Sequence, residues 1–173
     1  MTTLAALPKR VYRWGALCLG LALAACASGP PTPDWQMDAH GASQKAQDAY
    51  LAGDTRVEQL EWNRAREALA RTGRLDLLAR LELLRCAGRV AGLVFEPWAG
   101  FDALRQDAPA AEKAYADYLA GQLTSQDMEL LPPAQRNAAQ ASQTDAGAQL
   151  SGIEDPLSRL VAAGVLLKTG HAT

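Results

Sequence analysis

Residues 75–92 read LDLLARLELLRCAGRVAG and are apolar on nearly every face of a helix. Helices of this kind are covered by other elements on several sides, so the pattern predicts the central helix of the domain. A single coherent polar stripe runs along it and consists of Glu82, Arg85 and Arg89. The large apolar residues on the other faces are Leu75, Leu77, Leu78, Leu81, Leu83, Leu84 and Val90.

The segments before this helix carry the start and stop signals of two further helices. Thr55, followed by Glu58, has the form of a capping box that opens a helix ending at Gly73. An earlier helix is expected over residues 41–52, with Gly53 as its left-handed cap.

The segments after the central helix also predict helices, separated by loops. Asp155 and Pro156 supply a cap and a first-turn proline, which are typical of a helix start. The small, polar residues 142–152 are expected to form a loop. No alternating β pattern occurs, so the sequence predicts an all-α fold. The remaining helices are expected over residues 109–120, 134–141 and 156–168, with a short helical turn near residues 102–105.

A repeat links two of the predicted helices. Residues 42–53 (ASQKAQDAYLAG) and 110–121 (AAEKAYADYLAG) share seven identities in twelve positions. Their offset of 68 residues is twice the period of about 34 residues seen in tetratricopeptide hairpins. Alternatively, two alanine-rich helices that end in glycine look alike through composition alone. In either case we expect antiparallel helical hairpins packed side by side.

The first of these units resembles a tetratricopeptide hairpin. Ala46, Trp62 and Ala65 fall where that family places two small packing residues and a large aromatic residue. The turn of the hairpin falls at Gly53-Asp54. The resemblance covers about half of the chain after residue 26 and implies a small α-solenoid-like array that binds proteins. The chain departs from the family at Glu58, at the turn of residues 86–88 and at Pro133.

The N-terminal segment has the order of features found in export signals. A basic front precedes an apolar run over residues 14–25, which is shorter than the roughly 20 residues that a membrane-spanning helix needs. The run Leu23-Ala24-Ala25-Cys26 resembles the lipobox of bacterial lipoproteins. This resemblance implies that residues 1–25 are a cleaved signal peptide.

The same resemblance implies cleavage between Ala25 and Cys26, with diacylglycerol on the Cys26 thiol and a further acyl chain, such as palmitate, on the new amino terminus. Residues 26–37 then form a lipidated, Pro-rich tether, and residues 38–173 form the helical domain. Ala27 follows the cysteine in place of Asp, which implies the periplasmic face of the outer membrane and not retention at the inner one. Alternatively, Cys26 lies by chance beside a conventional cleavage site.

Charge and cysteine content exclude several functions. Three of the 17 Lys and Arg residues precede Cys26, whereas all 19 Asp and Glu residues follow it, so the processed chain is acidic. This charge argues against a nucleic-acid partner. With Cys18 removed and Cys26 lipidated, no internal disulfide can form. The remaining Cys86 has apolar neighbours and is expected to be a buried, inert thiol.

Catalytic and metal-binding motifs are missing from the sequence. His40 and His171 have no Cys, His or carboxylate neighbour at metal-ligand spacing. No nucleophile motif or phosphate-binding glycine loop occurs. The sequence therefore predicts a protein that is not an enzyme and uses neither a metal nor another cofactor.

Arginines offer a possible binding surface. Residues 55–90 contain eight arginines and five acidic residues, and we select Arg85 and Arg89 as candidate contacts for an anionic partner. Alternatively, these arginines lie on solvated faces and pair within their own helices. The pairs expected in that case are Arg64–Glu67 and Glu82–Arg85.

Aromatic residues follow the central helix in a loop that contains Phe95, Trp98 and Phe101. They either line a groove for a peptide, with Trp98 as our candidate, or fill the core. The preferred interpretation is a lipid-anchored scaffold or adaptor that binds an envelope protein. The alternatives are a helical bundle for a small or lipid ligand, with the Leu-rich helix lining its cavity, and a purely structural envelope protein.

Overall fold

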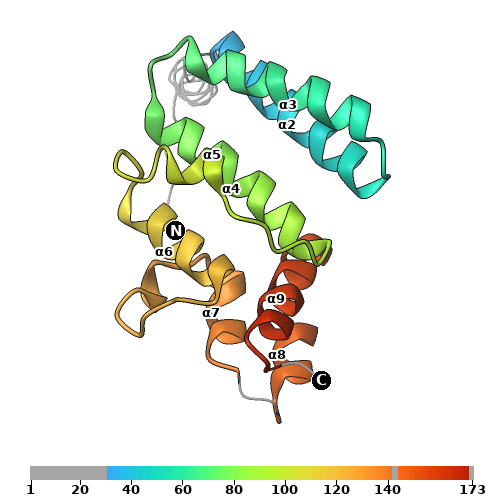
Figure 1. The fold of residues 1–173 in the computed structure, drawn as a ribbon, viewed down its shortest axis with the longest axis vertical. Coiled ribbons are helices and arrows are strands. Elements are labelled where there is room, and N and C mark those ends of the chain that lie inside the picture. Colours follow the sequence, from blue (N-terminus) through green and yellow to red (C-terminus); the bar gives the residue numbers. More distant parts are fainter. Residues whose placement is uncertain (1–30, 142–143, 172–173) are drawn as a thin grey trace, which may run out of the picture. The chain divides into compact units, whose positions relative to one another are not determined.

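The computed structural model describes residues 31–141 and 144–171, and over these residues the chain is helical without β-strands (Figure 1). The predicted all-α fold is therefore confirmed for this part of the chain. The predicted signal peptide, its cleavage site and Cys26 lie outside the described residues. The described residues from Asp34 onward form one compact unit. Its helices are α2 (Asp34–Leu51), α3 (Thr55–Ala70), α4 (Leu75–Ala91), α5 (Ala99–Asp102), α6 (Ala110–Ala120), η1 (Met128–Leu130), α7 (Pro133–Ala139), α8 (Ala146–Ser151) and α9 (Pro156–Lys168).

Helices α2 and α3 form an antiparallel hairpin on one side of α4 (Figure 1). Gly53 ends the turn after α2 with φ of 78°, a left-handed conformation that favours glycine, as predicted. The interior of the hairpin combines small residues with one indole. Its buried members are Ala39, Ala42, Ala46, Trp62, Ala65, Ala68, Leu69 and, from α4, Leu81.

The predicted capping box at the start of α3 is wrong. Asp54 is the N-cap, and its Oδ1 accepts a hydrogen bond from the N–H of Val57 at 3.1 Å. The carboxylate of Glu58 is therefore not needed at the cap. It is buried and faces the arginines of α4.

Helix α4 is central, as its sequence predicts. It packs against α2 and α3 on one side and against α5, α6 and α9 on the others. At the contact with α9, a Cβ on Gly164 would lie 2.8 Å from Cγ1 of Val90 and closer still to the Val90 carbonyl oxygen. The larger core cluster joins α4 to these later elements. Its bulky members include Leu83, Val90, Phe101, Tyr118, Leu119, Leu131, Val161 and Val165.

Three predicted boundaries differ from the structure. Helix α2 begins at Asp34, so residues 34–37 belong to the helix and not to the tether, and Trp35 packs its first turn against the hairpin core. Helix α5 ends at Asp102, where the predicted turn was to begin. Residues 146–151, predicted as loop, form α8. The helical pattern of this segment is weak, and tertiary contacts stabilise the helix, because Ala146 and Leu150 pack against Leu166 of α9.

Replacing Asp155 with alanine should lower the free energy of unfolding by about 1 kcal/mol. Oδ2 of Asp155 accepts a hydrogen bond from the N–H of Ser158 at 2.7 Å, as predicted for the cap of α9. This bond holds the pKa of Asp155 below its usual value. Because folding lowers this pKa, ionised Asp155 stabilises the fold at any pH above the pKa that the group has in the unfolded state. This contribution is lost as the pH falls through the pKa that the group has in the folded state. Urea unfolding at neutral and acidic pH measures both effects; equal stability of variant and parent at neutral pH would contradict the cap.

Candidate functional site

Glu58, Arg85 and Arg89 form one charged cluster between α3 and α4. Arg85 donates from Nε and Nη2 to Oε1 of Glu58 at 3.3 and 3.2 Å, and Arg89 donates from Nη2 to the same oxygen at 2.8 Å. Glu58 is 3% exposed, whereas the side chains of Arg85 and Arg89 are 33% and 29% exposed. One carboxylate faces two guanidinium groups, so this cluster keeps an excess positive charge.

Aromatic rings of the α2–α3 hairpin orient the two arginines. The guanidinium of Arg89 lies 4.4 Å from the ring centroid of Tyr50, and that of Arg85 lies 5.2 Å from the ring centroid of Trp62. Such cation–π contacts hold a guanidinium plane in place. Nη1 of Arg85 and both Nε and Nη1 of Arg89 donate to no acceptor among the described residues. These N–H groups can therefore bind an incoming carboxylate or phosphate.

A cavity of about 240 Å³ brings together the three residues that the sequence analysis selected for partner binding. Arg85 and Arg89 line it from α4, and Trp98 lines it from the loop of residues 94–98. Trp98 is half-buried and also packs against the larger core cluster. Its ring therefore serves the core and borders the cavity at the same time.

The other two aromatic residues predicted in this loop have different surroundings, and Phe101 lies in helix α5 and not in a loop. Phe101 is 1% exposed and lies in the core, whereas Phe95 is 40% exposed. The ammonium group of Lys168 lies 5.5 Å from the ring centroid of Phe95. Trp98 alone among the three borders the cavity.

Acidic residues also line the cavity. Glu82 is 4% exposed, and its carboxylate pairs with Arg66 of α3. A Cβ on Gly100 would lie 2.7 Å from Cδ of Glu82, so glycine at this position lets helix α5 pass close to this buried carboxylate. Glu96 is exposed and adds one negative charge to the wall. The cavity is thus polar on the α4 side and mixed on the loop side.

Cys86 also borders this cavity but is not suited to covalent chemistry. The thiol belongs to a residue that is 8% exposed, in agreement with the prediction of a buried cysteine. Burial raises its pKa well above the usual value, and the nearby Glu82 adds to this effect. The thiol therefore stays protonated at neutral pH and is a weak nucleophile.

The arginines of the two predicted intrahelical pairs have other partners, most of which lie on a neighbouring helix. Arg85 binds Glu58 of α3 in place of Glu82. The guanidinium of Arg64 lies 3.9 Å from Glu61 and 3.8 Å from Asp38 of α2, in place of Glu67. The arginines of α3 and α4 therefore tie the helices together as well as facing solvent.

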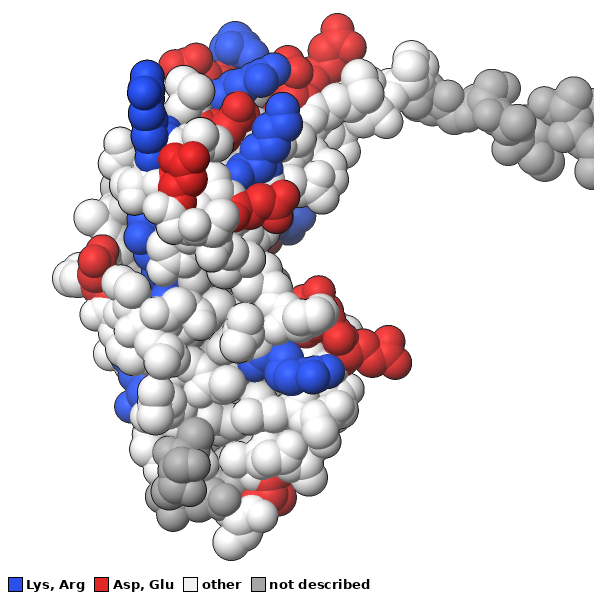
Figure 2. Space-filling view, turned by 90° about the vertical axis from the view of Figure 1, so that its right-hand side faces the viewer, with Lys and Arg blue, Asp and Glu red and all other residues white. Residues whose placement is uncertain are grey.

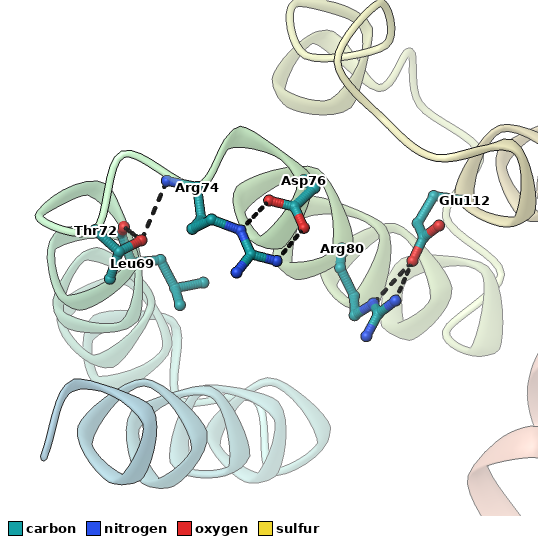
Figure 3. A network of polar contacts seen from close by, with 6 residues as sticks. All are labelled: Leu69, Thr72, Arg74, Asp76, Arg80 and Glu112. Carbon is teal, nitrogen blue, oxygen red and sulfur yellow. Dashed lines mark hydrogen bonds and ion pairs between the residues drawn. The ribbon is translucent and has the colours of Figure 1, made fainter. Parts of the chain in front are cut away.

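Further arginines near this region are paired on the surface. Arg74 donates to both carboxylate oxygens of Asp76 at 2.8 and 2.6 Å, and Arg80 of α4 binds Glu112 of α6 (Figure 3). In the space-filling view, basic and acidic side chains alternate over the part of the unit that holds the α2–α3 hairpin (Figure 2). This surface mixes both signs of charge, as expected for a solvated face.

Several residues of the site were not selected from the sequence, among them Glu58 and Gly100. Glu58 was assigned to a cap, although it shares a helical stripe with Trp62 and Ala65, at spacings of four and seven residues, and that stripe is buried. A carboxylate on a buried stripe needs a cationic partner, which was the available signal. Gly100 carried no signal, because its contact with Glu82 depends on the tertiary structure.

Comparisons with models of protein families, with curated proteins and with solved structures returned no match. Within the described ranges, no group of three or more His, Cys, Asp or Glu residues is placed to hold a metal ion. No helix among the residues that the structure describes has the length and apolar character needed to cross a membrane.

Proposed function

We propose that this protein is a lipid-anchored, non-enzymatic adaptor of the bacterial envelope, which holds a partner protein at the cavity of Arg85, Arg89 and Trp98. One observation carries this proposal. The two arginines with unused N–H groups and the half-exposed indole border the same cavity of about 240 Å³. Arginine and tryptophan are the residue types that most often supply the binding energy of protein interfaces.

The chemistry of the cavity favours an acidic side chain or chain terminus of the partner. A carboxylate can accept hydrogen bonds from Nη1 of Arg85 and from Nε or Nη1 of Arg89, which bind nothing else among the described residues. Apolar atoms next to that carboxylate can pack on Trp98. A cavity of this size fits one or two side chains and not a folded domain, so the partner would present an exposed loop or end.

The α2–α3 hairpin gives further support to an adaptor. Ala46, Trp62 and Ala65, which carry the tetratricopeptide resemblance, lie buried in its interior. We propose that the hairpin acts as a repeat-like unit, whose rings of Tyr50 and Trp62 hold the two arginines in position for binding. This proposed role requires only one complete helical hairpin, α2–α3, packed beside α4.

The anchor in this proposal is the lipid on Cys26, with the protein on the periplasmic face of the outer membrane. Residues 26–33 precede α2 and contain three prolines in their last four positions. An extended, Pro-rich chain spans about 3.1 Å per residue, so this tether would give a reach of about 25 Å. The cavity would then lie near the membrane surface and face partners in the periplasm.

Cys26→Ser should abolish acyl labelling of the protein and release it from the membrane fraction. Cys86→Ser is the matched control, because it removes a buried thiol and leaves the lipobox intact. Metabolic labelling with a palmitate analogue, followed by membrane fractionation, measures both properties. Labelling and membrane retention that persist in Cys26→Ser would contradict the anchor.

The double variant Arg85→Lys/Arg89→Lys should lower recovery of the partner at least fivefold in affinity capture from solubilised envelopes. Lysine keeps a positive charge beside Glu58 but lacks the planar fork that binds a carboxylate through two N–H groups. Arg71→Lys is the control, since Arg71 is exposed and lies outside the cavity. Equal recovery by the double variant and the control would overturn the proposed binding site.

A further inference from the structure

A second and larger cavity, of about 380 Å³, lies between α4, α6 and residues 130–132. It is lined mostly by apolar side chains, and two of them, Leu83 and Leu84, come from the Leu-rich helix α4. Small-ligand sites occupy about 300–1,000 Å³, so this cavity lies at the lower end of that range.

The apolar wall is open to an incoming ligand. Leu130 is 40% exposed beside Leu131, which is 1% exposed, and Leu84 and Tyr115 are half-buried. Leu131 is covered by the fold, whereas Leu130 and parts of Leu84 and Tyr115 stay uncovered by the residues that the structure describes. The opening therefore favours a ligand with an apolar body.

The charged groups of this wall are Arg80 and Glu112, and the basic one faces solvent. Nε and Nη2 of Arg80 both donate to Oε1 of Glu112, with the first bond at 2.8 Å (Figure 3). The side chain of Arg80 is 69% exposed, whereas that of Glu112 is 9% exposed. Nη1 of Arg80 has no acceptor among the described residues. The accessible end of this pair is therefore a cation with a free N–H group.

We propose that this cavity binds a single-chain fatty acid, with its hydrocarbon chain along Leu84, Tyr115 and Leu130 and its carboxylate at Arg80. The mainly apolar wall takes the chain, and the one exposed guanidinium complements an anionic head. The volume suits one chain of medium length and not a two-chain phospholipid. This site is distinct from the cavity of Arg89 and Trp98, so either proposal can be correct when the other is wrong.

Photo-cross-linking of the full chain in a non-ionic detergent tests this site. The probe is dodecanoate with a diazirine in its chain, and the comparison probe has the same chain with a trimethylammonium head. We expect dodecanoate to label residues of this cavity and to label them about fivefold more than the cationic probe, the upper range for a solvent-exposed charge pair. Each buried methylene should also tighten binding about fourfold, so a decanoate probe should label less.

Leu84→Trp should fill the cavity and reduce labelling by dodecanoate at least fivefold. Leu160→Trp is the control, because Leu160 is 49% exposed on α9 and lies outside this cavity. Leu130→Glu places a negative charge at an exposed wall position and should repel the carboxylate while the fold stays intact. The proposal would be overturned if dodecanoate did not label this cavity or labelled it no more than the cationic probe does. It would also be overturned if labelling were unchanged in both Leu84→Trp and Leu130→Glu.

Discussion

Gly164→Ala is expected to lower the free energy of unfolding by about 2–3 kcal/mol, the upper part of the usual range for an extra methyl group forced into a packed core. The added Cβ would lie 2.8 Å from Cγ1 of Val90 and closer to the Val90 carbonyl oxygen, where α9 crosses α4. A backbone oxygen cannot rotate away as a flexible side chain can, so one helix must shift. Urea unfolding followed by circular dichroism measures the loss.

The control for this variant is Gly147→Ala, also inside a helix. A Cβ on Gly147 would meet no atom within 4 Å. Alanine is the better helix former by about 1 kcal/mol, so this variant should be neutral or more stable than the parent. Similar stabilities for the two alanine variants would contradict the close crossing of α4 and α9.

Phe101→Ala is expected to destabilise the fold by about 3–5 kcal/mol, the usual cost of removing a buried phenylalanine. Phe101 is 1% exposed and belongs to the cluster that joins α4 to α6 and α9. Removing its ring leaves a cavity in the core that the rigid neighbouring helices cannot close. Thermal and urea unfolding should both show the loss.

Phe95→Ala is the matched control, at a phenylalanine in the loop before α5. Phe95 is 40% exposed, and the ammonium group of Lys168 lies 5.5 Å from its ring centroid. An exposed cation–π contact contributes about 0.5–1 kcal/mol. The loss of unfolding free energy in Phe95→Ala should therefore be several times smaller than that in Phe101→Ala. A loss for Phe101→Ala as small as that for Phe95→Ala would contradict the role of Phe101 in anchoring α5 to the core.

Helix positions with strong local signals could be predicted from the sequence. The αL glycines Gly53 and Gly121, at φ of 78° and 74°, end the two similar segments as their sequences indicate. Asp155 and Pro156 start α9 as predicted. Local chemistry decides these positions, and the sequence shows it directly.

The remaining features depend on contacts between distant segments. Helix α8 has few apolar residues of its own and forms because Ala146 and Leu150 meet Leu166 of α9. The pairing of α4 with α9 brings together Val90 and Gly164, and no pattern in the sequence announces it. Tertiary contact overrides weak local preference in both cases.

The candidate site was partly predictable. The stripe of Arg85 and Arg89 and the loop residue Trp98 were selected by residue type and position, and the structure places all three around one cavity. The role of Glu58 was misassigned because its position fits two roles. Its spacing from Thr55 fits a capping box, and its spacing from Trp62 fits a buried stripe of α3. Only the packing of α3 on α4 separates these two roles.

The measurement that tests the central claim most directly is site-specific cross-linking in intact cells. A photo-reactive amino acid replaces Glu96, which is exposed and lines the cavity, and in a control it replaces Asn63, which is exposed on α3 and lines no cavity described for this unit. The proposed function predicts one discrete protein adduct at position 96, absent at position 63 and lost when Arg85 and Arg89 are both lysine. No adduct at position 96, or the same adducts at both positions, would contradict it.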